Sequence, residues 1–316
     1  MDPSLRIARL KDRAHMLQLS RSFFFERGVL EVDCPILSFS ASVDVHIDLI
    51  PVQYGEKETM YLHSSPEFGM KRLLAEGIGD IYQLSHVFRN EECGPKHNPE
   101  FLMAEWYRQG VSLSQMIEET ADFIRLFLGP LPLRCISYRS LFFQELGIDP
   151  FSASCQELLS CLLDRHIPVY PEILSEGKDA LCNLLLATCL EPQLGKEELT
   201  VLTHYPASQS ALAKKIWVDD IEVAERFEIY FSGTELANGY HELTDPIEQR
   251  HRFIVANEER QRLGKPPLPL DEYFLAALAK GLPDCCGVAV GVDRLLMLRQ
   301  KMPSLEAVLP FSWTFV

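Results

Sequence analysis

The sequence contains no long hydrophobic run. Its densest apolar stretch, around Leu184–Leu190, is far shorter than the roughly 18–20 residues that cross a membrane. The first residues, MDPSLRIARLKD, also lack the apolar segment of a secretion signal. These absences predict a cytoplasmic protein with no membrane partner.

Positive charge is scarce as well. The 316 residues include 30 Lys and Arg against 45 Asp and Glu, which gives a formal net charge of −15. Such a surface repels phosphate backbones on the whole, so nucleic acid is not the expected partner. The net charge does not exclude a local basic groove.

Several familiar signatures are missing. The nine cysteines include no C-x-x-C pair, so reduced, mostly buried thiols are expected, with a zinc site as the alternative. The sequence has no G-x-G-x-x-G dinucleotide fingerprint, no G-x-x-x-x-G-K-[ST] phosphate loop and no G-x-S-x-G nucleophile. The chemistry therefore has to be sought in other patterns.

What the sequence does contain is a globular balance, with 47% hydrophobic and 24% charged residues. Helical patterns cover 3–27, 113–128 and 246–263, and strand patterns cover 29–34, 81–109, 199–204, 224–240 and 287–292. Antiparallel strands grouped between helices, without regular alternation, predict an α+β fold. We expect one domain over residues 1–316, with a mostly helical, insertion-like portion at about 136–200.

Residues 87–107, VFRNEECGPKHNPEFLMAEWY, predict two strands joined by a loop. Because side chains alternate along a strand, the return strand presents one apolar face to the core and a second face that mixes acids with aromatic rings. That second face carries Phe101, Met103, Glu105 and Tyr107, while Arg89 and Glu91 share a face on the first strand. Such a surface suits a flat ring, an anion and a cation; a surface hairpin with salt bridges is the alternative.

Residues 224–242, AERFEIYFSGTELANGYHE, predict a hairpin with Ser232-Gly233 at its turn. Tyr230 would then face Glu235, and Glu228 would be a diagonal neighbour of Glu235, at about 7 Å. Two carboxylates so close suit a shared Mg²⁺, and an exposed acidic hairpin is the alternative. A bulge at Asn238-Gly239 would turn Asn238 and Glu242 toward the same site.

The segment GVAVGVDR at 287–294 predicts a strand with one nearly bare face. Gly287, Ala289 and Gly291 leave room on that face for a flat ligand close to the backbone, and Arg294 can bind a phosphate. Tight packing against a helix explains such small residues equally well.

Taken in order, these segments resemble the three motifs of class II aminoacyl-tRNA synthetases. GVLEVDCP (28–35) is similar to motif 1, FRNEECGPKHNPEF with MAEWY to motif 2, and GVAVGVDRL to motif 3. SPEFGMKRLL, HNPEF, ELANGYHEL and GVDRL most resemble lysyl-tRNA synthetases, and the resemblance spans about residues 5–312. It implies an antiparallel sheet flanked by helices, and a homodimer formed through motif 1.

The departures from those synthetases are informative. No N-terminal anticodon-binding OB domain is expected, Ala289 replaces the middle glycine of motif 3, and Tyr240 stands where phenylalanine is usual. With HYPASQSALA (204–213), these features resemble synthetase paralogues that attach (R)-β-lysine to a lysine of elongation factor P. The resemblance implies elongation factor P as protein substrate, β-lysine as small-molecule substrate and no stable tRNA binding.

The resemblance also assigns roles to residues. ATP would be bound by Arg89, Asn90, Glu91, Asn98, Phe101, Glu235, Leu236, Gly291 and Arg294. Mg²⁺ would be held by Glu228 and Glu235. The amino acid would be bound by Ser65, Pro66, Glu67, Glu105, Tyr107, Asn238, Tyr240, Glu242 and Ala289. Within these sets, Arg89 and Arg294 would be catalytic, because they neutralise phosphate charge.

The implied reaction has two steps, formation of an aminoacyl-adenylate and transfer of the aminoacyl group to the ε-amine of a protein lysine. One alternative is a truncated lysyl-tRNA synthetase-like enzyme that uses α-lysine and another acceptor. The other is an inactive paralogue that serves as a regulatory binding subunit. Ala289 adds a methyl group to the floor of the amino-acid site, so we expect it to disfavour α-lysine.

Overall fold

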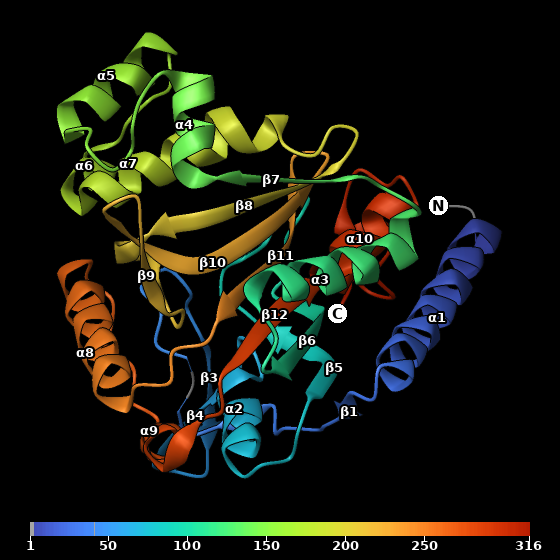
Figure 1. The fold of residues 1–316 in the computed structure, drawn as a ribbon. Coiled ribbons are helices and arrows are strands. Elements are labelled where there is room, and N and C mark those ends of the chain that lie inside the picture. The colour runs from blue at the N-terminus through green and yellow to red at the C-terminus, as the bar shows by residue number, and fades with distance from the viewer. Residues whose placement is uncertain (1–2, 41) are drawn as a thin grey trace. The chain divides into compact units, whose positions relative to one another are not determined.

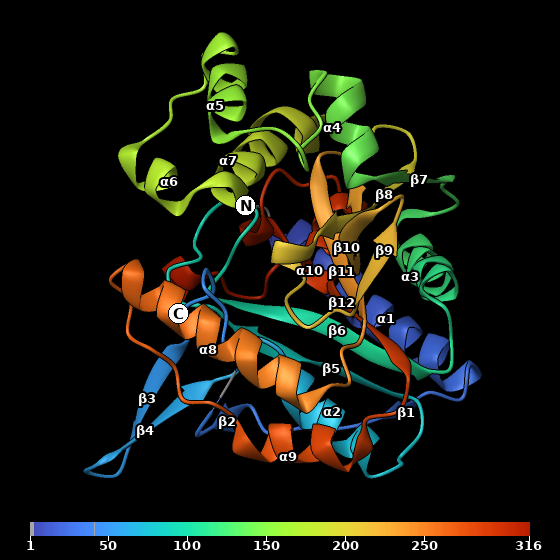
Figure 2. The same cartoon turned by 60° about the vertical axis from the view of Figure 1, so that its left-hand side comes forward.

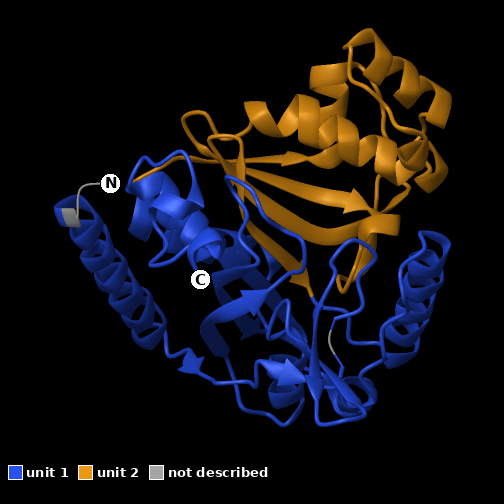
Figure 3. Ribbon diagram, turned by 180° about the vertical axis from the view of Figure 1, so that it is seen from behind, with its two compact units in different colours: residues 1–129, 242–316 blue, residues 130–241 orange. Residues whose placement is uncertain are grey.

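The computed structural model describes residues 3–40 and 42–316. The chain divides into two compact units, residues 1–129 with 242–316 and residues 130–241 (Figure 3). Helices and strands follow one another without regular alternation (Figure 1), so the predicted α+β class is confirmed. Each unit is described separately below.

The first unit contains a sheet with the strand order β1 (Leu30–Glu31), β5 (Ile81–Phe88), β6 (Glu100–Gln109) and β12 (Cys285–Gly291). β5, β6 and β12 pair antiparallel, as expected, whereas β1 pairs parallel with β5. The strand expected over 29–34 is wrong in length, because the Cys34 N–H donates to the Gln83 side chain at 2.8 Å rather than to a neighbouring strand.

Helices α1 (Pro3–Glu26), α3 (Leu113–Leu128) and α10 (Val292–Arg299) belong to the same unit. Trp106 of β6 is fully buried, with its ring centroid 5.2 Å from that of Phe24 in α1 and 5.3 Å from that of Phe123 in α3. The face of β6 that carries Trp106 is therefore the core face, as its alternation predicts. The opposite face, with Glu105 and Tyr107, is left for the site.

The remaining helices of this unit are α2 (Glu67–Ala75), α8 (Pro246–Arg262) and α9 (Glu272–Gly281), with short 3-10 turns at Leu305–Ala307 and Trp313–Phe315. α2 is fixed against α9 by Phe68 and Phe274, whose rings stack at 4.3 Å. A small antiparallel sheet has the order β2 (Leu37–Ser38), β4 (Glu58–Leu62) and β3 (Ile50–Tyr54). The ribbon of β3 and β4 stands at the lower left of Figure 2.

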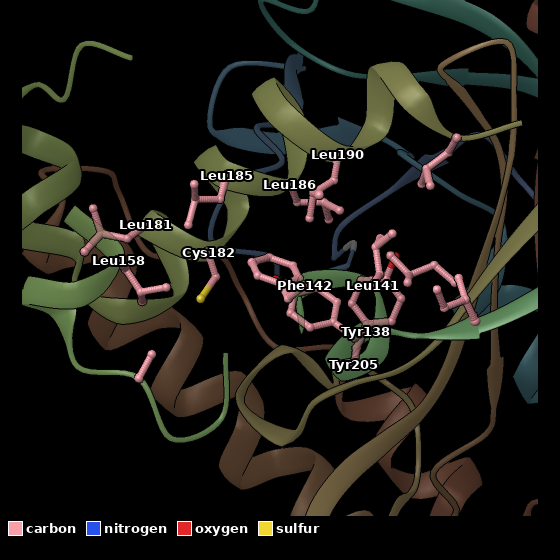
Figure 4. Close-up of a cluster of buried hydrophobic side chains, with 14 of the residues drawn as sticks. Tyr138, Leu141, Phe142, Leu158, Leu181, Cys182, Leu185, Leu186, Leu190 and Tyr205 are labelled. Atoms are coloured by element: carbon pink, nitrogen blue, oxygen red, sulfur yellow. The ribbon is translucent and has the colours of Figure 1, made fainter. Parts of the chain in front are cut away.

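The second unit contains the strand order β11 (Thr234–His241), β10 (Ile221–Phe231), β8 (Leu199–Pro206) and β7 (Leu133–Ser137), with β9 (Lys215–Val218) also paired to β10. Its helices are α4 (Tyr138–Leu146), α5 (Cys155–Asp164), α6 (Pro171–Glu176) and α7 (Lys178–Leu185), followed by a π-helical turn Leu186–Leu190 and 3-10 turns Glu191–Gln193 and Ala207–Gln209. These helices surround an apolar cluster that includes Tyr138, Phe142 and Leu185 (Figure 4). They fall within the portion expected to be helical, while the single domain over 1–316 stays a prediction.

The hairpin of β10 and β11 has the predicted turn, since Phe231 pairs with Thr234 and Tyr230 with Glu235. The predicted bulge at Asn238-Gly239 is wrong. The register shifts between Ile229 and Tyr230, which leaves Leu236 as the extra residue. This position lets two successive apolar residues, Leu236 and Ala237, both be buried, at 2% and 1% exposure. Glu228 consequently lies opposite Asn238.

Candidate active site

Three buried carboxylates gather in the first unit. Glu67 starts α2, Glu105 lies on β6 and Glu242 precedes α8, and their exposed fractions are 8%, 2% and 1%. The ammonium of Lys71 lies 2.6 Å from Glu67 Oε1 and 2.5 Å from Glu242 Oε2. Three acids facing one base leave an excess of negative charge, which a buried site tolerates only when a cation or a proton compensates it.

The side chain of Glu105 accepts its hydrogen bonds from hydroxyl groups. The Ser65 hydroxyl donates to Glu105 Oε2 at 2.6 Å, and the Tyr107 hydroxyl donates to Oε1 at 2.8 Å. Burial first, and then the negative charge of Glu67, raise the pKa of Glu105 to about 8. A carboxyl group with such a pKa is mostly protonated at pH 7, and a nearby cation would favour loss of that proton.

The bare face of β12 lies directly beside these acids. In the register of β6 and β12, Tyr107 pairs with Gly287 and Glu105 pairs with Ala289. A Cβ at Gly287 would come within 2.3 Å of both Glu242 Oε1 and Tyr107 Cε1. Glycine at 287 is thus what lets the two side chains meet over the strand, and Ala289 places its methyl group next to Glu105.

Motif-2 residues form a second part of the unit. The Arg89 guanidinium lies 5.2 Å from the centre of the half-buried Phe101 ring, and the Arg89 N–H donates to the Pro99 carbonyl at 2.9 Å. The side chain of Asn98 is anchored to the backbone of Glu100 and Trp313. An aromatic ring next to a guanidinium suits a flat base that carries phosphates.

Arg294 lies in the first turn of α10. Its Nη2 lies 2.8 Å from His97 Nε2, and its Nε donates to the Lys96 carbonyl at 3.2 Å, so the motif-2 loop holds it. The neighbouring Asp293 is 2% exposed, accepts a hydrogen bond from the Leu102 N–H at 2.7 Å and forms an ion pair with Arg13 of α1. Asp293 thereby fixes the start of α10 against β6 and α1.

In the second unit, one face of the β10–β11 hairpin surrounds a buried ion pair. Arg226 Nη2 lies 2.5 Å from Glu228 Oε1, and Arg226 Nε donates to Asn238 Oδ1 at 3.2 Å. The Tyr205 hydroxyl donates to Glu228 Oε2 at 2.5 Å, and the Tyr230 hydroxyl donates to the same atom. Glu228 is thus held in one orientation by three donors.

The predicted site residues separate into groups. The structure brings Ser65, Glu67, Glu105, Tyr107 and Glu242 into one cluster, and Pro66 caps α2 beside them. Arg89, Phe101 and Asn98 occur in the motif-2 hairpin, with Asn90 and an exposed Glu91 in its loop. Gly291 caps α10 before Arg294. In the second unit Asn238 belongs to the group around Glu228. Glu235 and Tyr240 are partly exposed. The side chain of Leu236 is buried, which leaves only its backbone for a ligand.

Sequence reasoning missed Lys71, Arg226 and His97 as members of these groups. For Lys71 the signal was present, because Glu67 and Lys71 stand four residues apart on one helix. For Arg226 it was the alternation that places Arg226 on the face of Glu228. The contact of His97 with Arg294 joins residues 197 positions apart, and no local pattern signals it.

Comparison with known proteins matches this architecture. The family model of class II tRNA synthetases (D, K and N) matches residues 5–314, so the chain belongs to this family. Among the curated proteins, similar relatives bear the name elongation factor P–(R)-β-lysine ligase. The protein of Haemophilus influenzae (strain PittGG) is 42% identical over 98% of this chain and 96% of its own length. Those of Avibacterium paragallinarum and Edwardsiella ictaluri (strain 93-146) are 44% and 45% identical, again over 98% of this chain and over 97% and 96% of their own lengths.

Within the described residues, no helix combines the length and the apolar character that crossing a membrane requires.

Proposed function

We propose that this chain is an ATP-dependent ligase that activates (R)-β-lysine as an adenylate and transfers it to the ε-amine of a lysine on elongation factor P. The observation that carries the proposal is the buried group of three carboxylates with one lysine. Its remaining negative charge matches the two ammonium groups of a diamino acid. The names of the relatives point to the same substrate and acceptor.

In the first step the substrate carboxylate attacks the α-phosphorus of ATP. A new O–P bond forms, the bond to the β-phosphate oxygen breaks, and pyrophosphate leaves with the electron pair. Arg89, beside the ring of Phe101, would neutralise the α-phosphate and the carboxylate, and Arg294, beside His97, would bind the terminal phosphate. Positioning and charge neutralisation are the main requirements of phosphoryl-group chemistry.

In the second step the neutral ε-amine of the acceptor lysine attacks the carbonyl carbon of the adenylate. The amide bond forms, AMP leaves, and the amine loses one proton. Neither step needs a covalent enzyme nucleophile. The enzyme contributes a fixed orientation for the amino acid, because its ammonium groups are bound by acids that Ser65, Tyr107 and Lys71 hold in place.

The residues proposed for Mg²⁺ fit that ion. Carboxylate oxygens are the ligands that Mg²⁺ prefers, together with phosphate oxygens. Glu228 Oε1 accepts one hydrogen bond, from Arg226, and so keeps an accepting position. Glu235, on β11 opposite Tyr230, is partly exposed. We propose that both glutamates hold Mg²⁺, which when bound would neutralise phosphate charge.

Pyrophosphate exchange dependent on a lysine isomer tests the first step. Arg294→Ala should lose about ten- to hundredfold in exchange rate, because a charge-assisted hydrogen bond contributes about 1.5–3 kcal/mol. Arg262→Ala, on the exposed part of α8, serves as the matched control. Near-normal exchange by Arg294→Ala would remove Arg294 from the phosphate site, and no exchange with any lysine isomer would refute the proposed activity.

A further inference from the structure

Lys71 is the basic residue that contacts two carboxylates of the acid cluster. It is 1% exposed and bridges two carboxylates that come from different parts of the chain, Glu67 on its own helix and Glu242 ahead of α8. Its ammonium also lies 5.9 Å from the ring centre of Tyr107 and 6.0 Å from that of Phe274. A lysine is seldom buried so fully unless acids compensate its charge.

The position of Lys71 is fixed by its helix. α2 is held by the buried side chains Phe68, Met70 and Leu74, and Phe68 stacks on Phe274 of α9. Burial and the two short ion pairs hold the ammonium within the cluster. It is a permanent cation, and it occupies the side of the cluster that Glu67 and Glu242 share.

The charge of Lys71 sets the net charge of the acid cluster. Once a bound ammonium group replaces the proton of Glu105, Glu67, Glu105 and Glu242 together carry three negative charges, and Lys71 reduces the excess to two. A diamino acid brings two ammonium groups, and the balance is then complete. Without Lys71 the cluster would have one more negative charge than the substrate can neutralise, and burial would favour the uptake of a proton in its place.

We propose that Lys71 is a positioning residue of the amino-acid site, a built-in ammonium that orients Glu67 and Glu242 and sets the charge of the pocket to accept two further ammonium groups. This inference rests on the proposed function, because it names what makes the site select diamino acids. Lys71 acts through the two carboxylates and takes no part in bond making.

The electrostatics of the groups around Lys71 agree with this role. Burial alone would lower the pKa of Lys71, but the carboxylates of Glu242 and Glu67 outweigh burial and raise that pKa above its ordinary value. Tyr107 and Cys285 also face the cluster. Burial first, and then nearby carboxylates, raise the pKa of both groups, so neither contributes charge near neutral pH.

The kinetic test compares Lys71→Met, which keeps the length but removes the charge, with Lys280→Met on the exposed end of α9 as the matched control. In Lys71→Met we expect the KM for the lysine isomer at pH 7 to rise by about tenfold or more, while the KM for ATP changes by less than about twofold. The loss should shrink toward pH 9, where the extra proton leaves the cluster. Equal changes in both KM values, or a pH profile identical to that of Lys280→Met, would overturn the proposal.

Chemical rescue separates charge from packing. Lys71→Ala opens a space of the shape of propylammonium. Added propylammonium should restore lysine-dependent exchange in this variant by about tenfold. Propanol fills the same space without charge and should not restore it. Rescue by both compounds to the same extent would show that Lys71 only fills volume.

A titration without substrate keeps the inference distinct from the proposed activity. In protein labelled with ¹³C at the glutamate carboxyl carbons, Lys71→Met should show one more buried carboxyl titrating between pH 6 and 8 than Lys280→Met does. If Lys71→Met does not fold, Lys71→Met/Glu67→Gln removes one acid together with the base and so keeps the excess of two charges. This double variant should show no more buried carboxyls titrating between pH 6 and 8 than Lys280→Met does. Unchanged titration of Lys71→Met, or an additional buried carboxyl titrating in the double variant, would overturn the inference even if exchange is never observed.

Discussion

Glu105 governs the protonation of the unliganded amino-acid site. Because burial and Glu67 raise its pKa to about 8, the folded protein keeps a proton on Glu105 that the unfolded chain releases above its ordinary pKa of 4.5. The folded state thus binds more protons between these values, and stability must fall as pH rises through the window.

Glu105→Gln should remove this contribution. We expect the free energy of unfolding of the wild type to decline between pH 5 and 8 by up to about 1.4 kcal/mol per pH unit more steeply than that of Glu105→Gln. Denaturant unfolding at several pH values measures the slopes, with Glu118→Gln on the exposed face of α3 as the control. Parallel slopes for wild type and Glu105→Gln would contradict the assigned proton.

Ala289 should set the preference between lysine isomers. Ala289 lies directly opposite Glu105 in the strand register, which would put its methyl group on the floor of the proposed amino-acid site. Removing the methyl in Ala289→Gly should lower the ratio of kcat/KM for (R)-β-lysine over α-lysine by about tenfold, because one methyl group discriminates by about 1–3 kcal/mol. A wild type that prefers α-lysine, or an unchanged ratio, would count against this role.

At the scale of residues, strand alternation was enough to place Trp106 in the core and Glu105 and Tyr107 on the opposite face of β6. It could not show that Glu242 meets Tyr107 over Gly287, because that meeting depends on three segments far apart in the chain. Sequence reasoning also did not predict the ion pair that Glu228 forms with Arg226. The sharing of Mg²⁺ between Glu228 and Glu235 stays a prediction.

Among the elements, β12 has a bare face that leaves space for the side chains of Glu242 and Tyr107. Gly287→Ala would push a methyl group to within 2.3 Å of Glu242 and Tyr107. We expect a loss of stability of about 1–3 kcal/mol from overpacking. We also expect the KM for the amino acid to rise more than the KM for ATP. The measurement is thermal unfolding together with amino-acid and ATP titrations of pyrophosphate exchange.

Gly94→Ala is a suitable comparison, since a Cβ there meets open space. Its stability should match that of the wild type. If Gly287→Ala proves as stable as Gly94→Ala and binds the amino acid normally, the close meeting of Glu242 and Tyr107 over β12 is not required.

The longer elements were predictable because their hydrophobic pattern repeats over many residues. α3 occupies 113–128 and β6 occupies 100–109, as their patterns indicate. The bulge was misplaced because Asn-Gly favours a turn locally, whereas the burial of Leu236 and Ala237 decides the register. The strands β1 and β2 have two residues each, which is too few to show an alternating pattern in the sequence. Their backbone partners lie elsewhere in the chain.

For the whole molecule, a homodimer through the motif-1 region is the expected assembly. The end of α1 and the segment after it expose large apolar side chains, with Phe25 84%, Leu30 52% and Phe39 57% exposed. Large apolar side chains exposed in this way favour a symmetric contact with a second copy. Phe25→Glu/Leu30→Glu should sediment as a monomer at micromolar concentration, whereas the wild type should sediment as a dimer.

Phe143→Glu, in α4, tests whether any exposed phenylalanine would have the same effect. Phe143 is 63% exposed and belongs to the second unit. We expect this variant to remain a dimer. A monomeric wild type would refute the dimer, and a monomeric Phe143→Glu would move the contact away from motif 1.

The most direct test of the account is transfer to the acceptor. Purified protein, ATP and Mg²⁺ are incubated with labelled (R)-β-lysine or α-lysine, and with elongation factor P, the factor with its acceptor lysine changed to arginine, or lysine tRNA. The account predicts label from (R)-β-lysine on elongation factor P, little label from α-lysine, and none on the arginine variant or on tRNA. Efficient labelling of tRNA while the factor stays unlabelled would contradict it.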